Sequence, residues 1–452
     1  MIWNVREYGA LADGRTVNTS AIQNTIDRCH EAGGGTVLIE GGVYVSGTIF
    51  LRSNVTLEIA QGTILKASPD IRDYAENVHH NRYRNEEALD RCFLYGEDLE
   101  NIGICGRGSI EGSSKAFPNE GSIYRPMLIR FLRCRQIHIE DIRLCDAAAW
   151  TTAFLDSEYI WISKVYIHNE KRYNGDGLDF DGCAHVFIDN CSITGTDDNL
   201  CLQASSKEYP VKDIHISNCE FTSLCAGIRI GLKSIGDIYN VVISNCTMDR
   251  VWREGIKIEC TEGGSISNIV IQNVTMRDVT RPIFMILNNR FKTDDYGSSV
   301  ELEQMPEIGS MENITITNLT AVDTEEMKNI HYRFGNDIMG EPKFNGIRID
   351  AEEHHSICGV TLQNIRYHSI GGVKKADIST EYPPVLDLLL HPGEVTSENY
   401  YPDWSRAAYL DIRSVEDLIL DNICFDSTEP DEREPYYIEN SGIIRQDIRV
   451  KA

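Results

Sequence analysis

Three aspartates stand at equivalent points of two short segments that are built alike. Asp176 lies two residues before the apolar Leu178, and Asp198 lies two residues before Leu200, with Asp197 directly ahead of it. If these segments are neighbouring strands in register, the carboxylates come about 4.8 Å apart along the stack. Crowded carboxylates raise the pKa of at least one member, so that a protonated acid stands beside ionised ones near neutral pH.

A protonated carboxylic acid beside a carboxylate is the pair that hydrolysis of a glycosidic bond requires. The acid protonates the leaving oxygen, and the carboxylate activates a water molecule. Two other interpretations stay open: aspartates that only form turns at strand starts, and a cluster that holds Ca²⁺ or Mg²⁺. Turns account poorly for three acids on adjacent strands, and the chain contains no calcium-type loop. We therefore expect a hydrolytic site with no metal and no cofactor.

The elements that must bring these acids together belong to an internal repeat. An apolar alternation that ends in asparagine occurs seven times, at Asn190, Asn218, Asn245, Asn273, Asn318, Asn364 and Asn422. The first four copies are 28, 27 and 28 residues apart. β-Branched residues alternate with polar ones and are interrupted by Gly, Asn and Asp, which favours strands over helices. The repeat indicates a solenoid, because a propeller blade needs about 40–50 residues.

A second set of short strands runs in step with the asparagine repeat. Their first apolar residues are Leu178, Leu200, Ile228, Ile256, Ile283 and Ile347. Two or three strands per coil, stacked on the next coil, describe an all-β parallel β-helix. The asparagines fit bends at which side-chain amides bond to their counterparts one coil away. Cys191, Cys219 and Cys246 follow three of these asparagines and are expected to stack as small buried groups.

The continuous repeat predicts a single elongated domain, although 452 residues would suggest about three ordinary domains. An amphipathic helix with a Ser/Thr start begins near Thr19 and ends at the glycines from Gly33, and we expect it to cap the solenoid. The expected parts are an N-terminal strand and cap helix over 1–35, rungs over 36–425 with long loops near 288–312, 326–344 and 369–410, and a tail over 426–452. Such loops are usually functional or disordered.

Strand alternation extends the patch of acids. If the leading apolar residues point inward, the next residues point outward, and these are Asp179, Cys201, Arg229 and Lys257. Two residues further on lie Asp181, Gln203, Gly231 and Glu259. Arg229 and Lys257 then stand one and two coils beyond Asp198, where they could bind sugar hydroxyls or a carboxylate, or only neutralise the acids. Trp150 and Tyr173 could form an aromatic platform for a sugar ring, or pack within loops.

Composition disfavours several other classes of function. The net charge of −26 and the pI near 4.8 argue against nucleic acid and anionic membranes as partners, because both reward Lys/Arg patches. No apolar run of about 18 residues is present that could span a bilayer. The 14 cysteines lack a disulfide-framework spacing, and no signal-like segment follows Met1. These features favour a cytoplasmic location, although a chain whose leader had been removed would look the same. The oligomeric state stays open.

The acid motifs resemble those of the polygalacturonase family of glycoside hydrolases. Asn174 and Asp176 match the family's Asn-x-Asp motif, Asp197 and Asp198 match its paired aspartates, and the similarity extends from residues 4–10 through nearly the whole chain. The resemblance implies a right-handed parallel β-helix that cleaves glycosidic bonds with inversion. It also implies that Asp197 is the general acid, while Asp176 and Asp198 hold and activate the water. Asn174 and Asp179 would then help to bind the substrate.

Two further motifs depart from the family pattern. The family's Gly-His-Gly motif falls on 225–227 and has no histidine, and its Arg-Ile-Lys motif falls on 257–259, where Lys257 keeps a cation but Glu259 replaces the lysine. The histidine of the family's Trp-Thr-x-His stretch near Trp150 is also missing. In the family these motifs help to grip a galacturonate carboxylate, which a glutamate repels at a cost of about 1–3 kcal/mol where solvation is poor.

The sequence therefore predicts an inverting glycoside hydrolase that acts on an oligosaccharide or polysaccharide of plant or microbial origin. The changed motifs favour a pectin-related, neutral or mixed sugar over plain polygalacturonate. If the long loops rise beside the acids, they close one end of the groove and impose exo-action. Two alternatives remain: a β-helix polysaccharide lyase or epimerase, which would need Ca²⁺ or a basic Lys/Arg, and a non-catalytic carbohydrate-binding solenoid.

Overall fold

The computed structural model describes residues 1–76, 91–118, 124–289, 306–329, 333–334, 337–338, 346–378 and 405–451. Most of the long loops expected near 288–312, 326–344 and 369–410 lie outside the described residues. The chain divides into two compact units. Unit 1 comprises Met1–Asp197 and Asp213–Cys219, and unit 2 comprises Asp198–Lys212 and Glu220–Ala452. The prediction of one domain over 1–452 stays a prediction.

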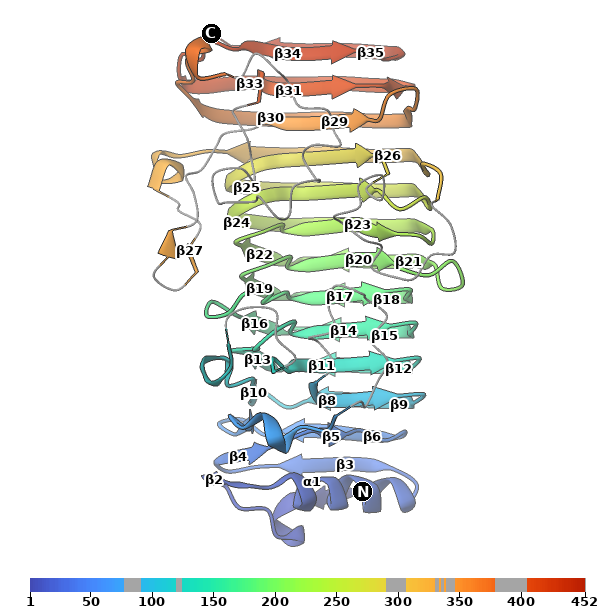
Figure 1. Ribbon diagram of the computed structural model, residues 1–452, viewed down its shortest axis with the longest axis vertical. Coiled ribbons are helices and arrows are strands. Elements are labelled where there is room, and N and C mark those ends of the chain that lie inside the picture. Colours follow the sequence, from blue (N-terminus) through green and yellow to red (C-terminus); the bar gives the residue numbers. More distant parts are fainter. Residues whose placement is uncertain are drawn as a thin grey trace. The chain divides into compact units, whose positions relative to one another are not determined.

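Unit 1 consists of three columns of parallel strands that lie one above another (Figure 1). The first column contains β3 (Gly35–Ile39), β6 (Val55–Ile59), β9 (Glu100–Cys105), β12 (Arg135–Glu140), β15 (Glu158–Ser163) and β18 (Ala184–Asp189). The second contains β5 (Ile49–Phe50), β8 (Cys92–Glu97), β11 (Met127–Leu132), β14 (Thr152–Leu155) and β17 (Leu178–Asp181). The third contains β4 (Val43–Ser46), β7 (Ile64–Ala67), β10 (Ser109–Glu111), β13 (Arg143–Cys145), β16 (Tyr166–His168) and β19 (Ser192–Gly195). Each coil therefore contributes three strands.

Besides these columns and the helix α1 (Thr19–Glu31), the described residues of unit 1 form two edge strands and three short 3-10 turns. They are β1 (Ile2–Asn4), which pairs with β3, β2 (Asp13–Val17), which pairs with β4, and the turns η1 (Val5–Tyr8), η2 (Ile71–Asp73) and η4 (Ser114–Ala116). Strand β21 (Val211–Ser217) lies mostly in the 213–219 segment of this unit.

Unit 2 is built in the same way, but several of its strands run through the bends between columns (Figure 1). One column of unit 2 is formed by β20 (Leu200–Ala204), β23 (Ile228–Ser234), the end of β24 (Ile238–Cys260), the end of β25 (Ser265–Leu287), β29 (Ile347–Ala351), β31 (Ala407–Arg413) and β34 (Glu434–Glu439). The remaining strands are β22 (Glu220–Ser223), β26 (Ser310–Val322), β30 (Ile357–Gly371), β32 (Val415–Glu416), β33 (Leu418–Glu429) and β35 (Ile443–Val450). An antiparallel pair, β27 (Arg333–Phe334) with β28 (Asp337–Ile338), and the turns η7 (Glu325–Asn329) and η8 (Lys375–Asp377) lie outside the columns.

The leading apolar residues stack as the sequence predicts. Leu200 pairs with Ile228, Ile228 with Ile256, and Ile256 with Ile283, and all four are fully buried. Each such side chain contributes about 1.5–3 kcal/mol by leaving water. This stack of like residues is the core of unit 2, and it fixes the register of the outward-facing residues beside it. The all-β parallel β-helix is therefore confirmed.

The repeated asparagines form the predicted ladder in unit 2. Asn273 donates from Nδ2 to Oδ1 of Asn245 at 3.0 Å, and Asn318 donates to Asn273 at 3.0 Å. The ladder continues with Asn364 to Asn318 at 2.9 Å and Asn422 to Asn364 at 2.8 Å. All five adopt φ between 54° and 57°, a left-handed conformation that asparagine tolerates better than most residues. One residue type therefore meets two needs, the bend and the amide ladder.

Replacing a central rung of this ladder tests both needs. Asn318→Ala removes both ladder hydrogen bonds of this residue and places a side chain without a polar group at φ 55°. We expect the free energy of unfolding to fall by about 2–3 kcal/mol. Asn318→Gly keeps the bend without strain and should lose only about 1 kcal/mol. Urea denaturation of both variants measures the difference, and equal losses would contradict the role of the left-handed bend.

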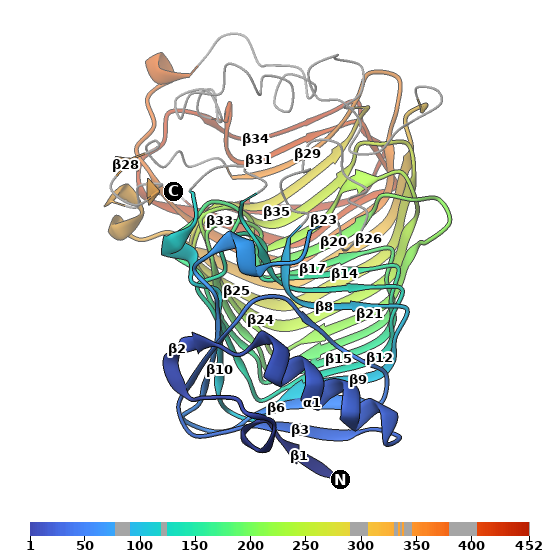
Figure 2. The same cartoon turned by 60° about the horizontal axis from the view of Figure 1, so that its bottom comes forward.

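The predicted N-terminal helix is present as α1 (Thr19–Glu31), which lies beside β3 (Figure 2). Its buried face presents Ile22, Ile26 and Cys29. Gln23 donates from Nε2 to the carbonyl of Phe50 at 2.9 Å and accepts from the Phe50 N–H at 2.8 Å, so the helix binds the backbone of β5. That the helix caps the end of the solenoid stays a prediction. Within the described part of the chain, no helix has the length and apolar character to cross a membrane.

Candidate active site

In unit 1, the turn that carries Asn174 and Asp176 lies against the turn that carries Asp197. The N–H of Gly175 donates to Oγ1 of Thr196 at 2.9 Å, and the N–H of Thr196 donates to the carbonyl of Gly175 at 3.2 Å. Nδ2 of Asn174 donates to Oδ2 of Asp197 at 3.2 Å. Asp176 and Asp197 therefore occupy adjacent coils of this unit, and the Asn174 amide orients the Asp197 carboxyl group.

The close approach of these two turns explains the glycine between Asn174 and Asp176. A Cβ atom at Gly175 would lie 2.5 Å from Oγ1 of Thr196, which is closer than two such atoms can come. Asn174 itself adopts φ 54°, the left-handed conformation that an asparagine tolerates. The glycine of the Asn-Gly-Asp sequence thus allows the two turns to come close enough for Asn174 to contact the next coil.

A buried arginine that sequence analysis did not single out holds this turn in place. Arg125 is fully buried and donates from Nη1 to the carbonyl of Tyr173 at 3.0 Å and from Nη2 to Oδ1 of Asn174 at 2.8 Å. Burial lowers the pKa of Arg125, and the charges of Asp176 and Asp197 oppose that shift. Arg125 therefore places a cation next to both acids of unit 1. It precedes Asp176 by 51 residues and Asp197 by 72 and belongs to no motif, so no sequence signal identifies it.

The other predicted residues of unit 1 differ in their access to solvent. Asp176 and Asp179 are buried, Asp197 is half-buried, and Tyr173 is 38% exposed. Trp150 is only 5% exposed and packs in an apolar cluster. This burial favours the packing interpretation of Trp150 over the platform interpretation, whereas Tyr173 keeps an accessible ring.

The outward face of β8, β11, β14 and β17 is covered. Tyr95, Arg130, Ala153 and Asp179 pair in register along this face, and all four are buried although they point away from the coil interior. Tyr95 and Ala153 belong to an apolar cluster that also contains Cys92, Met127, Leu132, Ala149, Trp150 and Leu155. We call this buried outward face the covered face.

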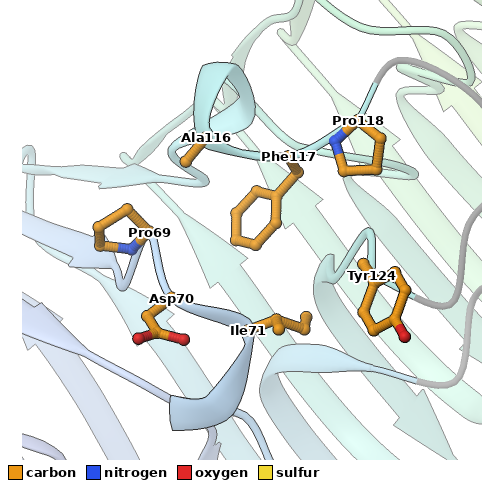
Figure 3. A pocket seen from close by; sticks show the side chains of 7 residues that line it. All are labelled: Pro69, Asp70, Ile71, Ala116, Phe117, Pro118 and Tyr124. Atoms are coloured by element: carbon orange, nitrogen blue, oxygen red, sulfur yellow. The ribbon is translucent and has the colours of Figure 1, made fainter.

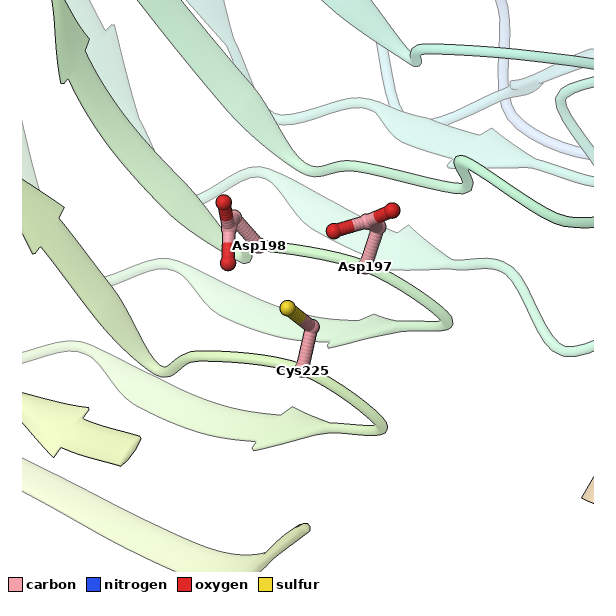
Figure 4. Close-up of side chains that lie close together, drawn as sticks. All are labelled: Asp197, Asp198 and Cys225. Carbon is pink, nitrogen blue, oxygen red and sulfur yellow. The ribbon is translucent and has the colours of Figure 1, made fainter. Parts of the chain in front are cut away.

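In unit 2, Asp198 is fully buried and enclosed by donors. Its Oδ1 accepts from the N–H of Ala226 at 3.1 Å, and its Oδ2 accepts from Nη1 of Arg229 at 2.5 Å. The thiol of Cys225 points toward the carboxylate (Figure 4), with Asp197 preceding Asp198 in the chain. The register also places Arg229 directly opposite Lys257, as the strand alternation predicts.

The charges around Asp198 keep it ionised. Burial alone would raise its pKa, but the cations Arg229 and Lys257 outweigh burial, and hydrogen bonds from Arg229 and Cys225 add to them, so that the pKa of Asp198 falls to about 2. The pKa of Arg229 is shifted upward. Burial lowers it, but the charges of Asp198 and Glu259 outweigh burial and raise it well above the ordinary value. At any ordinary pH, Asp198 is therefore a carboxylate that can accept a proton.

Asp198 belongs to a larger set of paired charges in unit 2. Nε of Arg229 donates to Oε2 of Glu259 at 3.2 Å, and Nζ of Lys257 lies 3.5 Å from Oε1 of Glu259 and 3.5 Å from Oε2 of Glu254. Nε of Arg253 lies 3.5 Å from the same Glu254 oxygen. We call these residues the charge cluster: Asp198, Arg229, Arg253, Glu254, Lys257 and Glu259. Its three cations meet three carboxylates, so the cluster offers no excess positive charge.

Arg253 and Glu254 are the members that sequence analysis missed. Glu254 lies two residues before Ile256, which is the spacing that identified Asp198 before Leu200. The same spacing rule could therefore have found Glu254. The series of acids is interrupted, however, because Ala226 occupies the equivalent place on the coil between Asp198 and Glu254. Nη1 of Arg253 also approaches Sγ of Cys225 at 3.3 Å, so its guanidinium lies over the position where the resemblance places the start of a Gly-His-Gly motif.

Comparisons with known proteins agree with the fold. Residues 74–365 match the model of glycosyl hydrolases family 28. The exo-poly-α-D-galacturonosidase of Dickeya chrysanthemi is 24% identical over 298 residues, which cover 54% of this chain and 49% of that protein. The probable rhamnogalacturonase A of Aspergillus oryzae is 28% identical over 248 residues, which cover 54% of this chain and 47% of that protein. The chain thus spans about half the length of the curated relatives it matches.

A solved structure shows the same fold along a longer stretch. The family 28 exopolygalacturonase of Yersinia enterocolitica superposes with a TM-score of 0.73 at 19% identity, covering 98% of this chain and 78% of that one. At this identity the likeness concerns the fold alone. The extent of the family match, which exceeds half of the chain, decides the assignment: the chain belongs to glycosyl hydrolases family 28.

Proposed function

We propose that this chain hydrolyses a glycosidic bond of a pectin-related oligosaccharide or polysaccharide with inversion at the anomeric carbon. The observation that carries the proposal is the contrast between two adjacent acids. Asp198 is held as a carboxylate by Arg229 and Lys257, whereas Asp197 is half-buried and meets the neutral amide of Asn174. A carboxylate that is held ionised, next in the chain to a second acid that a neutral amide orients, matches the base and the acid that this chemistry needs.

In the proposed reaction, Asp197 gives its proton to the glycosidic oxygen as the bond between that oxygen and the anomeric carbon breaks. A water molecule attacks the anomeric carbon from the opposite face. Asp198, together with Asp176, takes the proton that this water loses. The products are two shorter sugars, and the proton that Asp197 gave up returns from solvent before the next turnover.

The charge cluster supports a substrate other than plain polygalacturonate. A carboxylate on the sugar ring near Lys257 would meet the paired carboxylates Glu254 and Glu259, which already compensate that cation. Sugar hydroxyls, by contrast, can donate to carboxylates and accept from cations. We therefore propose a neutral or mixed sugar at this position. The covered face of unit 1 supports exo-action, because an open groove along those strands is what an internal cut requires.

Product analysis on a panel of oligosaccharides tests the proposal. Galacturonides, rhamnogalacturonan fragments, and neutral galactose and arabinose oligomers would be incubated with the protein. Time-resolved proton NMR reports the anomeric configuration of the first product, and mass spectrometry reports the product lengths. We expect an inverted anomer and the release of one terminal unit at a time. A retained anomer, random internal cuts or an ultraviolet-absorbing unsaturated product would each contradict the corresponding part of the proposal.

The substitution Glu259→Gln tests the preference for a neutral sugar. It leaves the shape of the site unchanged but removes one carboxylate, so that Lys257 and Arg229 together carry an uncompensated positive charge. We expect the ratio of kcat/KM for galacturonides to kcat/KM for neutral oligosaccharides to rise by about 10-fold, which corresponds to about 1.4 kcal/mol. Glu262→Gln changes another buried glutamate of unit 2 outside the charge cluster and serves as the control. A ratio that stays at the wild-type value in folded Glu259→Gln would remove the basis for this preference.

A further inference from the structure

Unit 1 contains a pocket that no predicted residue lines. It has a volume of about 350 Å³ and is bounded by the side chains of Pro69, Asp70, Ile71, Ala116, Phe117, Pro118 and Tyr124, which surround a common space (Figure 3). Small-molecule pockets measure about 300–1,000 Å³, so this one has the size for a small ligand such as a single sugar ring.

Hydrogen bonds connect both walls of the pocket to the turn that carries Asn174. On one wall, Nε of Arg172 donates to the carbonyl of Phe117 at 2.9 Å and to that of Ser114 at 3.0 Å. On the other wall, Tyr124 directly precedes Arg125, whose Nη2 donates to Oδ1 of Asn174. Asn174 in turn donates to Asp197, the proposed general acid. The side chains of Arg125 and Asn174 thus link the pocket wall at Tyr124 to Asp197.

The lining of the pocket is aromatic and apolar with a single acid. Tyr124 is 50% exposed and offers the face of its ring, while the Phe117 ring is fixed by an edge-to-face contact with Tyr74, with centroids 6.0 Å apart. Such rings bind the apolar faces of sugars and leave the hydroxyls to polar groups. Asp70 supplies an acceptor for those hydroxyls.

The seven lining residues include no cation. Two described arginines lie close to the lining: Arg172, which donates to the Phe117 carbonyl, and Arg72, whose Nε donates to both carboxylate oxygens of Asp70 at 2.9 and 3.0 Å. The hydrogen bonds from Arg72 hold the pKa of Asp70 at about 2, so its carboxylate is ionised at any working pH. A ring that carries its own carboxylate would therefore meet the Asp70 carboxylate, and both arginines already bind other groups.

We propose that this pocket is a subsite for one neutral sugar ring of the substrate, on the Asn174 side of Asp197. The proposal rests on the proposed function, and it adds a second place at which the chain selects neutral sugar over galacturonate. It assigns Tyr124 and Ala116 to substrate binding, at a distance from the charge cluster along the sequence.

The test compares substrates that differ by one ring. Ala116→Trp fills the pocket from an exposed position, and Tyr124→Ala removes its aromatic wall. We expect the ratio of kcat/KM for a neutral-ended trisaccharide to kcat/KM for the matching disaccharide to fall by about 10-fold in both variants. Tyr166→Ala changes a half-buried tyrosine of β16 elsewhere in unit 1 and should keep the wild-type ratio. An unchanged ratio in both pocket variants overturns the proposal.

A binding measurement separates this inference from the proposed function. If the wild-type protein cleaves none of the oligosaccharides, saturation-transfer NMR with methyl rhamnoside, methyl galactoside and galacturonate still reports on the pocket. Binding of a neutral methyl glycoside that disappears in Ala116→Trp supports the subsite even though the hydrolase proposal has failed. Equal binding in the wild type and Ala116→Trp, binding of galacturonate in preference, or no binding of any of the three sugars overturns the subsite.

Discussion

Asp197→Asn is expected to lower kcat by about 10²- to 10⁴-fold while KM changes little, because the amide cannot protonate the leaving oxygen. Asparagine has nearly the shape of aspartate, and its Oδ1 can still accept the hydrogen bond from Asn174. The half-buried position tolerates the lost charge, so the thermal unfolding midpoint should stay close to that of the wild type. The measurement is steady-state kinetics on the best substrate of the panel, with circular dichroism to verify the fold.

A change of leaving group distinguishes a general acid from a residue that only binds. The weakly basic phenolate of an aryl glycoside leaves without needing a proton. The loss of kcat in Asp197→Asn should therefore be smaller by at least an order of magnitude on such a substrate. The variant should also lose the alkaline limb of its pH profile. Asp189→Asn, on β18 of the same unit, provides the control for removing a carboxylate. An equal loss on both classes of substrate would contradict the assignment of Asp197 as the acid.

The repeated parts of this fold could be predicted from the sequence because they follow from periodicity. The alternation of apolar residues fixed which side chains point inward, and the stack from Leu200 to Ile283 follows it residue by residue. The asparagine ladder from Asn245 to Asn422 was likewise predictable, because a polar residue at the same point of each coil has few other uses. α1 begins at Thr19, as its Ser/Thr start indicates.

Parts of the candidate site could not be predicted, because they depend on contacts between segments far apart in the chain. Alternation gives the direction of Asp179 but not its burial, so the covered face of unit 1 was not foreseen, and nor was the packing of Trp150 in an apolar cluster. Arg125 lies outside every repeat, and only its hydrogen bond to Asn174 reveals its place. The roles of the three aspartates stay predictions, because the structure shows which residues lie close together, whereas only kinetics shows which of them react.

Charge pairing was also hidden from the sequence. Lys257 and Arg229 were expected either to grip a substrate or to neutralise acids, and spacing alone leaves both open. In the structure each is paired with Glu259, and Lys257 also faces Glu254. Side-chain reach decides this pairing, because a lysine or arginine can extend to either neighbouring coil. The neutralising interpretation therefore describes the protein without substrate.

Arg229→Met is expected to destabilise the protein by about 3–5 kcal/mol at neutral pH. The substitution keeps a long apolar stem but removes the charge between Asp198 and Glu259, both of which are fully buried. Without Arg229, only Lys257 and the hydrogen bonds from Ala226 and Cys225 oppose burial, so we expect the pKa of Asp198 to rise above its ordinary value of 3.8. Because a carboxylate that must act as a base would then be protonated over part of the working range, kcat/KM should fall and the acid limb should move to higher pH.

The dependence of stability on pH gives this prediction a definite sign. In the wild type the pKa of Asp198 is about 2 when folded, below its ordinary 3.8, so its contribution is complete above about pH 4 and is lost between about pH 4 and 2. In Arg229→Met we expect the pKa of Asp198 to be higher in the folded than in the unfolded protein. The contribution of Asp198 to stability is then greatest in acid and falls as the pH rises through the raised pKa. The difference in unfolding free energy between the two proteins should therefore grow from acid to neutral pH.

A second substitution shows whether the lost charge pair is the cause. Asp198→Asn combined with Arg229→Met removes the stranded carboxylate, so part of the lost stability should return at neutral pH although activity does not. Urea denaturation of the wild type, both single variants and the double variant completes the cycle. Recovery is expected because an amide at position 198 can still accept from the Ala226 N–H without bearing a charge. The loss of stability in Arg229→Met could instead be the same at all pH values and unchanged by the second substitution. That result would mean that Arg229 stabilises the coil by packing, and that other groups keep Asp198 ionised.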